Sequence, residues 1–177
     1  MTLSRSAPLN VLFLCTGNSA RSILSEALMN DLGQQTANGR VWMGWSAGSR
    51  PSGVPHPDGL KELQNRGHRT DLYRSKSWDE FSPKTEGAGD MPSDEGPSMD
   101  IVITVCSNAA NEVCPIFPGQ HIKAHWPADD PAYIEPLAAR QQAFSDVYEI
   151  CKTRIEALIA LEDLTPEAVQ AIANIHA

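Results

Sequence analysis

NVLFLCTGNSARS, at residues 10–22, places an apolar run, a tight polar loop and the start of a helix in direct succession. The apolar run ends at Cys15 and predicts a buried strand, and the turn-forming residues after it predict a short loop. From Ser19 onward apolar residues recur at helical spacing, and Gly33 stands where a helix cap is expected. A strand, a loop and a helix in this order are the first unit of an α/β fold.

The alternation of strand and helix continues along the chain. Buried strands are predicted over 41–49 and 100–106, and a weaker strand over 121–126. Helices are expected over 58–66, along the apolar stripe from Phe144 to Ile159, and after Thr165 and Pro166. Strands that alternate with helices form parallel sheets. We therefore expect an α/β, doubly wound open sheet of about four parallel strands with helices on both faces.

Length and composition predict a single domain over residues 1–177, with a polar leader at 1–9. Residues 82–99 are acidic, rich in Pro and Gly, and without apolar periodicity, so we expect a surface insertion there. Such a stretch can bind a partner, but a solvated spacer is the more common case.

The charge balance excludes several classes of function. The chain carries 14 Lys and Arg against 22 Asp and Glu, a formal charge of −8, so we expect no nucleic-acid binding. Its apolar runs are far shorter than the roughly 20 residues of a membrane-spanning helix, so no membrane association is expected. The leader does not resemble a signal peptide, and we expect a cytoplasmic protein whose four cysteines are thiols.

The loop after the first strand is expected to bind an oxyanion, because backbone N–H groups converge there at a helix N-terminus. Arg21 offers a planar fork to two oxygens of a tetrahedral anion, and the same donors favour the nucleophilic thiolate of Cys15. In the plainer alternative, Cys15 only ends a buried strand and Arg21 is a surface residue. The missing G-K-[ST] pattern excludes a nucleotide-binding loop. The residues expected to surround the anion are Thr16, Gly17, Asn18, Ser19, Ala20 and Ser22.

Cys106 ends the third predicted strand, so it falls at the same sheet edge as Cys15 and can be its neighbour. Cys114 follows after residues 107–113. A helix over this segment would hold the alpha carbons of Cys106 and Cys114 about 12 Å apart, beyond the roughly 7 Å limit of a disulfide. A bond between them therefore requires the segment to unravel, which its modest helix propensity allows.

Two plainer interpretations of the cysteines stay open. Cysteines are commonly buried without further function, and Cys151, on the apolar stripe of the last long helix, is expected to be such a core residue. A zinc site is the other alternative, but its candidates lack the C-x2-C spacing, so no metal site is predicted. These candidates are Cys106, Cys114, His121 and His125.

Five motifs together resemble one known family. They are NVLFLCTGNSARS at 10–22, SAG at 46–48, SKSWDEF at 75–81, CSNAANEVCP at 106–115 and HWPADDPA at 125–132. Over about residues 9–161, the sequence is similar to arsenate reductases that share the fold of low-molecular-weight protein tyrosine phosphatases. The resemblance implies a low-molecular-weight phosphatase-like sheet and no bound cofactor.

The resemblance also implies a thiol relay. Cys15 attacks arsenate in the loop, Cys106 then attacks Cys15 and releases arsenite, and Cys114 takes over the disulfide with Cys106. A thioredoxin-like or glutaredoxin-like protein, or glutathione, would reduce that disulfide. Asp130 matches the general acid of the family, although an Asp-Pro pair can equally form a solvated turn.

Some members of the family hold a potassium ion beside the loop through an Asn, a Glu, a Ser and an Asp. Asn18, Glu26 and Ser46 match the first three, but Arg69 stands where the Asp would fall. A positive charge at that position disfavours a cation, so we expect no potassium ion. Ala20 also departs from the family, because many relatives have a second cysteine at this position of the loop.

Two other functions would use part of the same residues. A phosphatase hydrolysing phosphomonoesters would use the same nucleophile, arginine and acid with water, and would not need Cys106 or Cys114. Tyrosine phosphatases of this fold usually carry aromatic residues directly after Asp-Pro, whereas Ala132 precedes Tyr133 here. A non-catalytic oxyanion-binding module would leave an activated thiol and an acid unused. Arsenate reduction is therefore the favoured interpretation, and phosphatase activity is the alternative.

Overall fold

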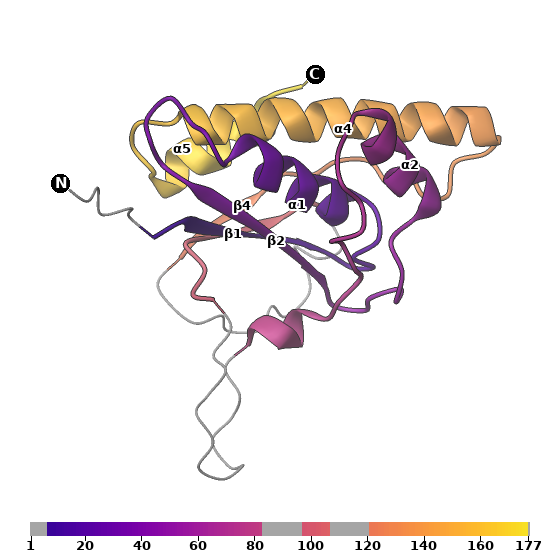
Figure 1. The fold of residues 1–177 in the computed structure, drawn as a ribbon, viewed down its shortest axis with the longest axis horizontal. Coiled ribbons are helices and arrows are strands. Elements are labelled where there is room, and N and C mark those ends of the chain that lie inside the picture. Colours follow the sequence, from indigo (N-terminus) through magenta and orange to yellow (C-terminus); the bar gives the residue numbers. More distant parts are fainter. Residues whose placement is uncertain (1–6, 83–96, 107–120, 177) are drawn as a thin grey trace, which may run out of the picture.

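The computed structural model describes residues 7–82, 97–106 and 121–176, and its centre is a parallel sheet of four strands in the order β2-β1-β3-β4 (Figure 1). The strands are β1 (Leu9–Cys15), β2 (Trp42–Gly48), β3 (Ile101–Thr104) and β4 (Ile122–His125). This arrangement confirms the predicted sheet. Cys15 lies opposite Gly48 in the register, and Leu14 lies opposite Thr104, so three strands end side by side.

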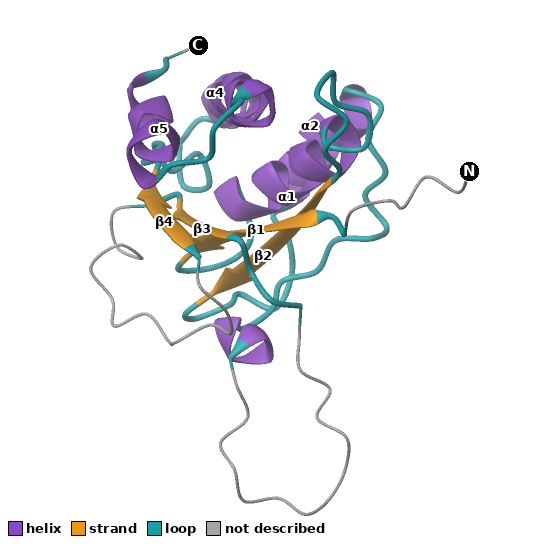
Figure 2. Ribbon diagram, turned by 90° about the vertical axis from the view of Figure 1, so that its left-hand side faces the viewer, coloured by secondary structure: helices purple, strands orange, loops and turns teal. Residues whose placement is uncertain are grey.

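Helices flank the sheet on its two faces. In Figure 2 the four α-helices of the described part lie on one face, and the short 3-10 helix η1 lies on the other. They are α1 (Arg21–Leu32), α2 (Pro57–Asn65), η1 (Trp78–Phe81), α4 (Leu137–Ala160), α5 (Pro166–Ala171) and the 3-10 turn η2 (Ile172–Asn174). In this part of the chain, no helix is long and apolar enough to cross a membrane.

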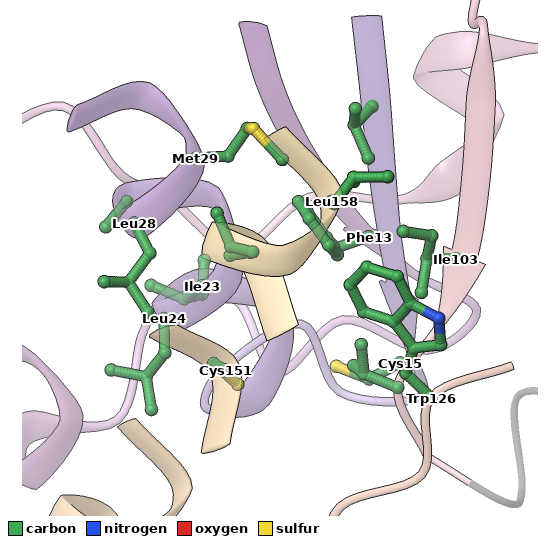
Figure 3. Packing of buried hydrophobic residues seen from close by; sticks show 14 of the residues in the cluster. Phe13, Cys15, Ile23, Leu24, Leu28, Met29, Ile103, Trp126, Cys151 and Leu158 are labelled. Carbon is green, nitrogen blue, oxygen red and sulfur yellow. The ribbon is translucent and has the colours of Figure 1, made fainter. Parts of the chain in front are cut away.

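The central strand β1 supplies both cores because its side chains alternate between the two faces. Val11 and Phe13 belong to the larger cluster with α1 and α4, whereas Leu12 and Leu14 pack with Phe81 of η1. Figure 3 shows the larger cluster, in which Cys151 and Leu158 of α4 face α1 and Trp126 packs near Phe13 and Ile103. The prediction that Cys151 is a core residue is confirmed, since it is 7% exposed.

Element ends follow the sequence signals closely. Thr165 caps α5 as expected, because its hydroxyl accepts from the N–H of Ala168 at 3.1 Å. Gly33 ends α1 in a right-handed conformation, with φ −79°, so it is not the left-handed cap that its type suggested. The predicted insertion at 82–99 and the leader at 1–9 fall mostly outside the described residues. Met99 is buried, however, and β1 begins at Leu9.

Candidate active site

The loop between β1 and α1 lies at the carboxyl edge of the sheet, where the sequence placed it. The sulfur of Cys15 is at its base, and this residue is 3% exposed. Gly48 on the neighbouring strand comes so close that a Cβ there would lie 2.5 Å from the carbonyl oxygen of Thr16. Glycine in the SAG turn is therefore required for the loop to close against β2.

Two donors of the loop face the sulfur of Cys15. The hydroxyl of Ser22 lies 2.9 Å from it, and the backbone N–H of Asn18 donates to it at 3.2 Å. Asn18 adopts a left-handed conformation, with φ 43°, which few residues other than Gly, Asn and Asp adopt at low cost. This conformation turns the N–H of Asn18 back toward the strand end and makes the loop tight.

The protonation of Cys15 differs from the sequence expectation. Burial raises the pKa of its thiol above the ordinary value, and the neighbouring Cys106 adds to this effect. The hydrogen bond from Ser22 and the charge of Arg21 lower the pKa but do not outweigh burial. The predicted low-pKa thiolate is therefore not what this geometry favours, because burial outweighs the groups that stabilise the charge.

Arg21 lies on the first turn of α1, and its fork faces the loop that follows β4. Nη1 donates to the carbonyl oxygen of Ala128 at 3.0 Å, and Nη2 donates to Asp130 Oδ2 at 2.6 Å. The Nε atom of Arg21 is buried and has no hydrogen-bond partner among the residues that the structure describes. A buried N–H group without an acceptor destabilises the folded state. An oxyanion bound in the loop would supply the missing acceptor.

A pocket of about 320 Å³ opens above the loop. Cys15, Arg21 and Asp130 all line it, so the structure brings together the predicted nucleophile, oxyanion-binding arginine and acid. Four further lining residues were not among the predicted site residues, namely Arg50, Ser52, Ala132 and Tyr133. Among them Tyr133 stands out, because it is an aromatic residue that is 88% exposed.

The loop that carries Asp130 is anchored from behind by Arg154, which sequence analysis also missed. Arg154 is 4% exposed, and its guanidinium donates to the carbonyl oxygens of Trp126 at 3.2 Å and Pro127 at 2.9 Å. It also donates to Ala173 at 2.9 Å, which joins the C-terminal residues to this loop. Burial lowers the pKa of Arg154, yet a guanidinium stays charged in proteins. Only its spacing on the apolar stripe of α4 could have suggested an inward orientation.

Cys106 lies just beyond β3 and is 3% exposed. The backbone N–H of Val105 donates to Leu14 at 2.8 Å, which holds this strand end beside the end of β1. The sulfur of Cys106 contacts the hydroxyl of Thr16, the residue after Cys15, at 3.7 Å. The predicted neighbourhood of Cys15 and Cys106 is thus present, whereas Cys114 lies outside the described residues.

A lysine, and not the arginine expected from the sequence, supplies the positive charge beside the loop. Arg69 is exposed and pairs with Asp71 at 2.7 Å, so that part of the prediction was wrong. The ammonium group of Lys76 lies 3.2 Å from Glu26 Oε2 and 3.3 Å from the hydroxyl of Ser46. These oxygens therefore do not fit a potassium ion, because a tethered cation already lies among them. Within the described residues, no group of three His, Cys, Asp or Glu side chains could hold a metal ion.

Comparison with known proteins agrees with this geometry. The family model of the low molecular weight phosphotyrosine protein phosphatases matches residues 10–170. The arsenate reductase of Bacillus licheniformis is 33% identical over 76% of this chain and 82% of its own length. The structure of a Corynebacterium glutamicum thioredoxin-dependent arsenate reductase superposes with a TM-score of 0.56 at 26% identity. That alignment covers 86% of this chain and 61% of that chain, so this chain spans about three-fifths of that protein.

A tyrosine phosphatase from T. tengcongensis has the same fold, with a TM-score of 0.59 over 84% of this chain and 98% of that chain. At 20% identity this likeness concerns the fold alone. The sheet and loop thus define a low molecular weight phosphotyrosine protein phosphatase-type enzyme. Within that family, the chain belongs to the arsenate reductases.

Proposed function

We propose that this enzyme reduces arsenate by a thiol relay that runs from Cys15 to Cys106 and then to Cys114. The observation that carries the proposal is the second buried thiol, that of Cys106, beside the loop. Its sulfur contacts the hydroxyl of Thr16, directly after the nucleophile. A hydrolytic enzyme does not need this thiol, whereas a two-electron reduction needs a second sulfur within reach.

In the first step, the sulfur of Cys15 bonds to arsenic and one arsenic–oxygen bond breaks. The departing hydroxyl group takes the proton of Asp130 and leaves as water, and the thiol proton passes to a remaining arsenate oxygen, so the step is balanced. Arg21 and the loop amides hold the remaining oxygens and stabilise their charge. Because the thiol pKa is raised by burial, Cys15 gives up its proton as the arsenic–sulfur bond forms.

In the second step, the sulfur of Cys106 attacks that of Cys15. The electron pair of the sulfur–arsenic bond passes to arsenic, which leaves as trivalent arsenite and takes the Cys106 proton on an oxygen, and a Cys15–Cys106 disulfide forms. Cys114 then attacks Cys106, and this exchange regenerates the Cys15 thiol. The overall reaction consumes two thiols and one arsenate and gives one disulfide, one arsenite and one water.

The relay needs an external reductant, and we propose a dithiol protein of the thioredoxin type. The Corynebacterium glutamicum neighbour is described as thioredoxin-dependent, which supports this choice over a glutaredoxin-like protein or glutathione. A reducing cytoplasm is the compartment in which such a partner keeps the cysteines as thiols.

Mass spectrometry of the reduced protein tests the relay. One equivalent of arsenate without reductant should convert two thiols of the wild type into a Cys106–Cys114 disulfide and release arsenite. The Cys114→Ser variant should accumulate the Cys15–Cys106 disulfide, and Cys106→Ser should release no arsenite. Cys151→Ser is the matched control and should behave as the wild type, since Cys151 is a core residue. If all thiols persist and arsenate stays pentavalent, the relay is wrong.

Phosphomonoester hydrolysis is a second candidate activity, favoured by one observation. Tyr133 lines the pocket that contains Cys15 and is 88% exposed, so its ring is available to stack on an aromatic leaving group. Cys15 would attack phosphorus in the same loop, and water would replace Cys106 as the second nucleophile.

A further inference from the structure

A buried ion pair lies close to the loop, between two residues that do not line the pocket. The side chains of Lys76 and Glu26 are 6% and 9% exposed, and Nζ lies 3.2 Å from Oε2. The three hydrogens of the ammonium group have three oxygen-bearing partners, because Ser46 Oγ and the carbonyl oxygen of Arg74 each lie 3.3 Å away. A buried ammonium group without such partners would be strongly destabilising.

A chain of hydrogen bonds connects this ion pair to the nucleophile. The hydroxyl of Ser46 donates to the carboxylate of Glu26 and accepts from Asn18 Nδ2 at 2.9 Å. The same Nδ2 atom donates to the hydroxyl oxygen of Ser22, also at 2.9 Å. Ser22 in turn lies 2.9 Å from the sulfur of Cys15.

Which atoms donate and which accept along this chain follows from the backbone N–H of Lys76 at one end and the sulfur of Cys15 at the other. The backbone N–H of Lys76 can only donate, so the atom that faces it at 2.7 Å is the carbonyl oxygen of Asn18. The amide nitrogen of Asn18 is therefore left to give its two hydrogens to Ser46 and Ser22. The hydroxyl oxygen of Ser22 accepts from Asn18, and its own hydrogen is available to the sulfur of Cys15. A thiolate can only accept, so Ser22 is the donor whenever Cys15 is ionised.

The charge of Lys76 supports this direction. Burial raises the pKa of Glu26, and the neighbouring ammonium group opposes that rise. A protonated Glu26 could donate to Ser46 instead of accepting from it. The hydroxyl hydrogen of Ser46 would then no longer be held by the carboxylate and could turn toward Asn18 Nδ2, which would weaken the bond that anchors this amide. Among the described residues, Arg74, which binds Glu80 at the surface, and the phenol of Tyr73 also interact with Glu26.

We propose that Lys76 is a positioning residue for the nucleophile: its buried ammonium group, through Glu26 and Ser46, holds Asn18 and Ser22 as donors toward the sulfur of Cys15. Lys76 does not touch the pocket, since the residues lining it do not include Lys76. The inference deepens the proposed function, because it concerns the reactivity of the same Cys15.

The test measures the rate at which iodoacetamide alkylates Cys15 between pH 6 and pH 10, with mass spectrometry of the Cys15 peptide. In Lys76→Met the carboxylate of Glu26 and the hydroxyl of Ser46 lose the ammonium group, so the donors Asn18 and Ser22 are held less firmly toward the thiolate. The pH midpoint of the alkylation rate should therefore rise by about one unit. At neutral pH this means about tenfold slower alkylation. The groups that also act on the sulfur, Cys106 and Arg21, are unchanged in this variant.

Two further variants separate positioning from a purely structural role. Ser46→Ala interrupts the chain but keeps the ion pair, so its midpoint should also rise, and it decides the question if Lys76→Met does not fold. The shifts of the single variants should not add in the double variant, because both act along one path. Lys152→Met is the matched control, since it removes an exposed Lys–Glu pair on α4, and its midpoint should equal that of the wild type.

A folded Lys76→Met or Ser46→Ala protein with the wild-type midpoint would overturn the proposal, and so would additive shifts. A variant that melts earlier with an unchanged midpoint would show that the ion pair only stabilises the fold. Alkylation requires no arsenate, so this result is independent of whether the thiol relay is correct.

Discussion

Arg21 and Asp130 are joined by an ion pair, with Nη2 2.6 Å from Oδ2, across the pocket that Cys15 lines. The guanidinium is the group expected to hold the oxyanion, so any oxyanion bound to it lies within reach of the carboxyl group. Asp130 also accepts from the N–H of Ala132 at 3.0 Å, which fixes its orientation in the loop. The pair thus holds the carboxyl group that we expect to act as the acid at the edge of the expected oxyanion site.

Asp130→Asn should therefore impair the chemical step more than binding. An amide cannot donate a proton to the departing oxygen, and general acids typically contribute about 10²-fold or more to rate. We expect kcat for arsenate to fall by about that factor while the dissociation constant of inorganic phosphate does not increase. Asp129→Asn is the control, because it changes the exposed neighbour, and its kcat should match the wild type. Equal activity of both variants would exclude Asp130 as the acid.

Arg21→Lys should weaken oxyanion binding in a way that a stability measurement detects. Lysine keeps the charge but loses the planar fork, so it cannot engage two oxygens side by side. A ligand at a hundred times its dissociation constant stabilises the folded state by about 2.7 kcal/mol. We expect phosphate to raise the melting temperature of the wild type clearly and that of Arg21→Lys little. Chloride at the same ionic strength is the control, and an equal rise in both proteins would contradict the assignment.

The sheet and the loop were predictable because local pattern determines them. The period of apolar residues in 10–22 identified the strand and helix, and the parallel sheet then brought Cys106 beside Cys15. Arg21 and Asp130 were each selected from a motif, although their direct pairing was not predicted. Their contact depends on how the loop after β4 folds back over α1, and no short-range pattern encodes this path.

Lys76 and the protonation of Cys15 were missed for a different reason. The distance from Lys76 to Glu26 spans fifty positions of sequence, and lysine is usually a surface residue, so its burial appears only in the tertiary structure. The number of donors around Cys15 suggested a thiolate, but its burial decides that the pKa of the thiol is raised. The sequence therefore identifies the residues of a site more readily than it predicts how far they are buried from solvent.

The stability of the protein should depend on pH through Asp58, which joins α2 to α4. Its carboxylate accepts from Arg140 at 2.7 Å, and this hydrogen bond holds its pKa below the ordinary value of 3.8. A lowered pKa in the folded state means stabilisation that is present above about pH 4 and is lost as the pH falls through the folded value. Asp58→Asn should therefore lower the free energy of unfolding by about 0.5–1 kcal/mol at pH 7. Near pH 2 the difference should vanish.

Urea denaturation at both pH values measures this difference. Glu135→Gln is the control, because Glu135 also pairs with Arg140 but its side chain is 77% exposed. Its effect at pH 7 should be close to zero. A loss in Asp58→Asn that persists unchanged at pH 2 would mean that the ion pair is not its cause.

The exposed ring of Tyr133 predicts hydrolysis of aryl phosphates as a side activity, which variants can separate from arsenate reduction in the same loop. Aryl phosphates present a ring beside the oxyanion, whereas arsenate has none, so only the former can stack on Tyr133. Tyr133→Ala should raise KM for p-nitrophenyl phosphate about threefold to tenfold, as expected for one aromatic contact, and leave KM for arsenate unchanged. Tyr133→Phe keeps the ring and should behave as the wild type.

In the same assay Cys15→Ser should abolish hydrolysis and Cys106→Ser should retain it, because water replaces the second thiol. If Cys106→Ser abolished hydrolysis as well, Cys106 would be needed for the loop itself, and its loss could no longer be read as evidence for a relay.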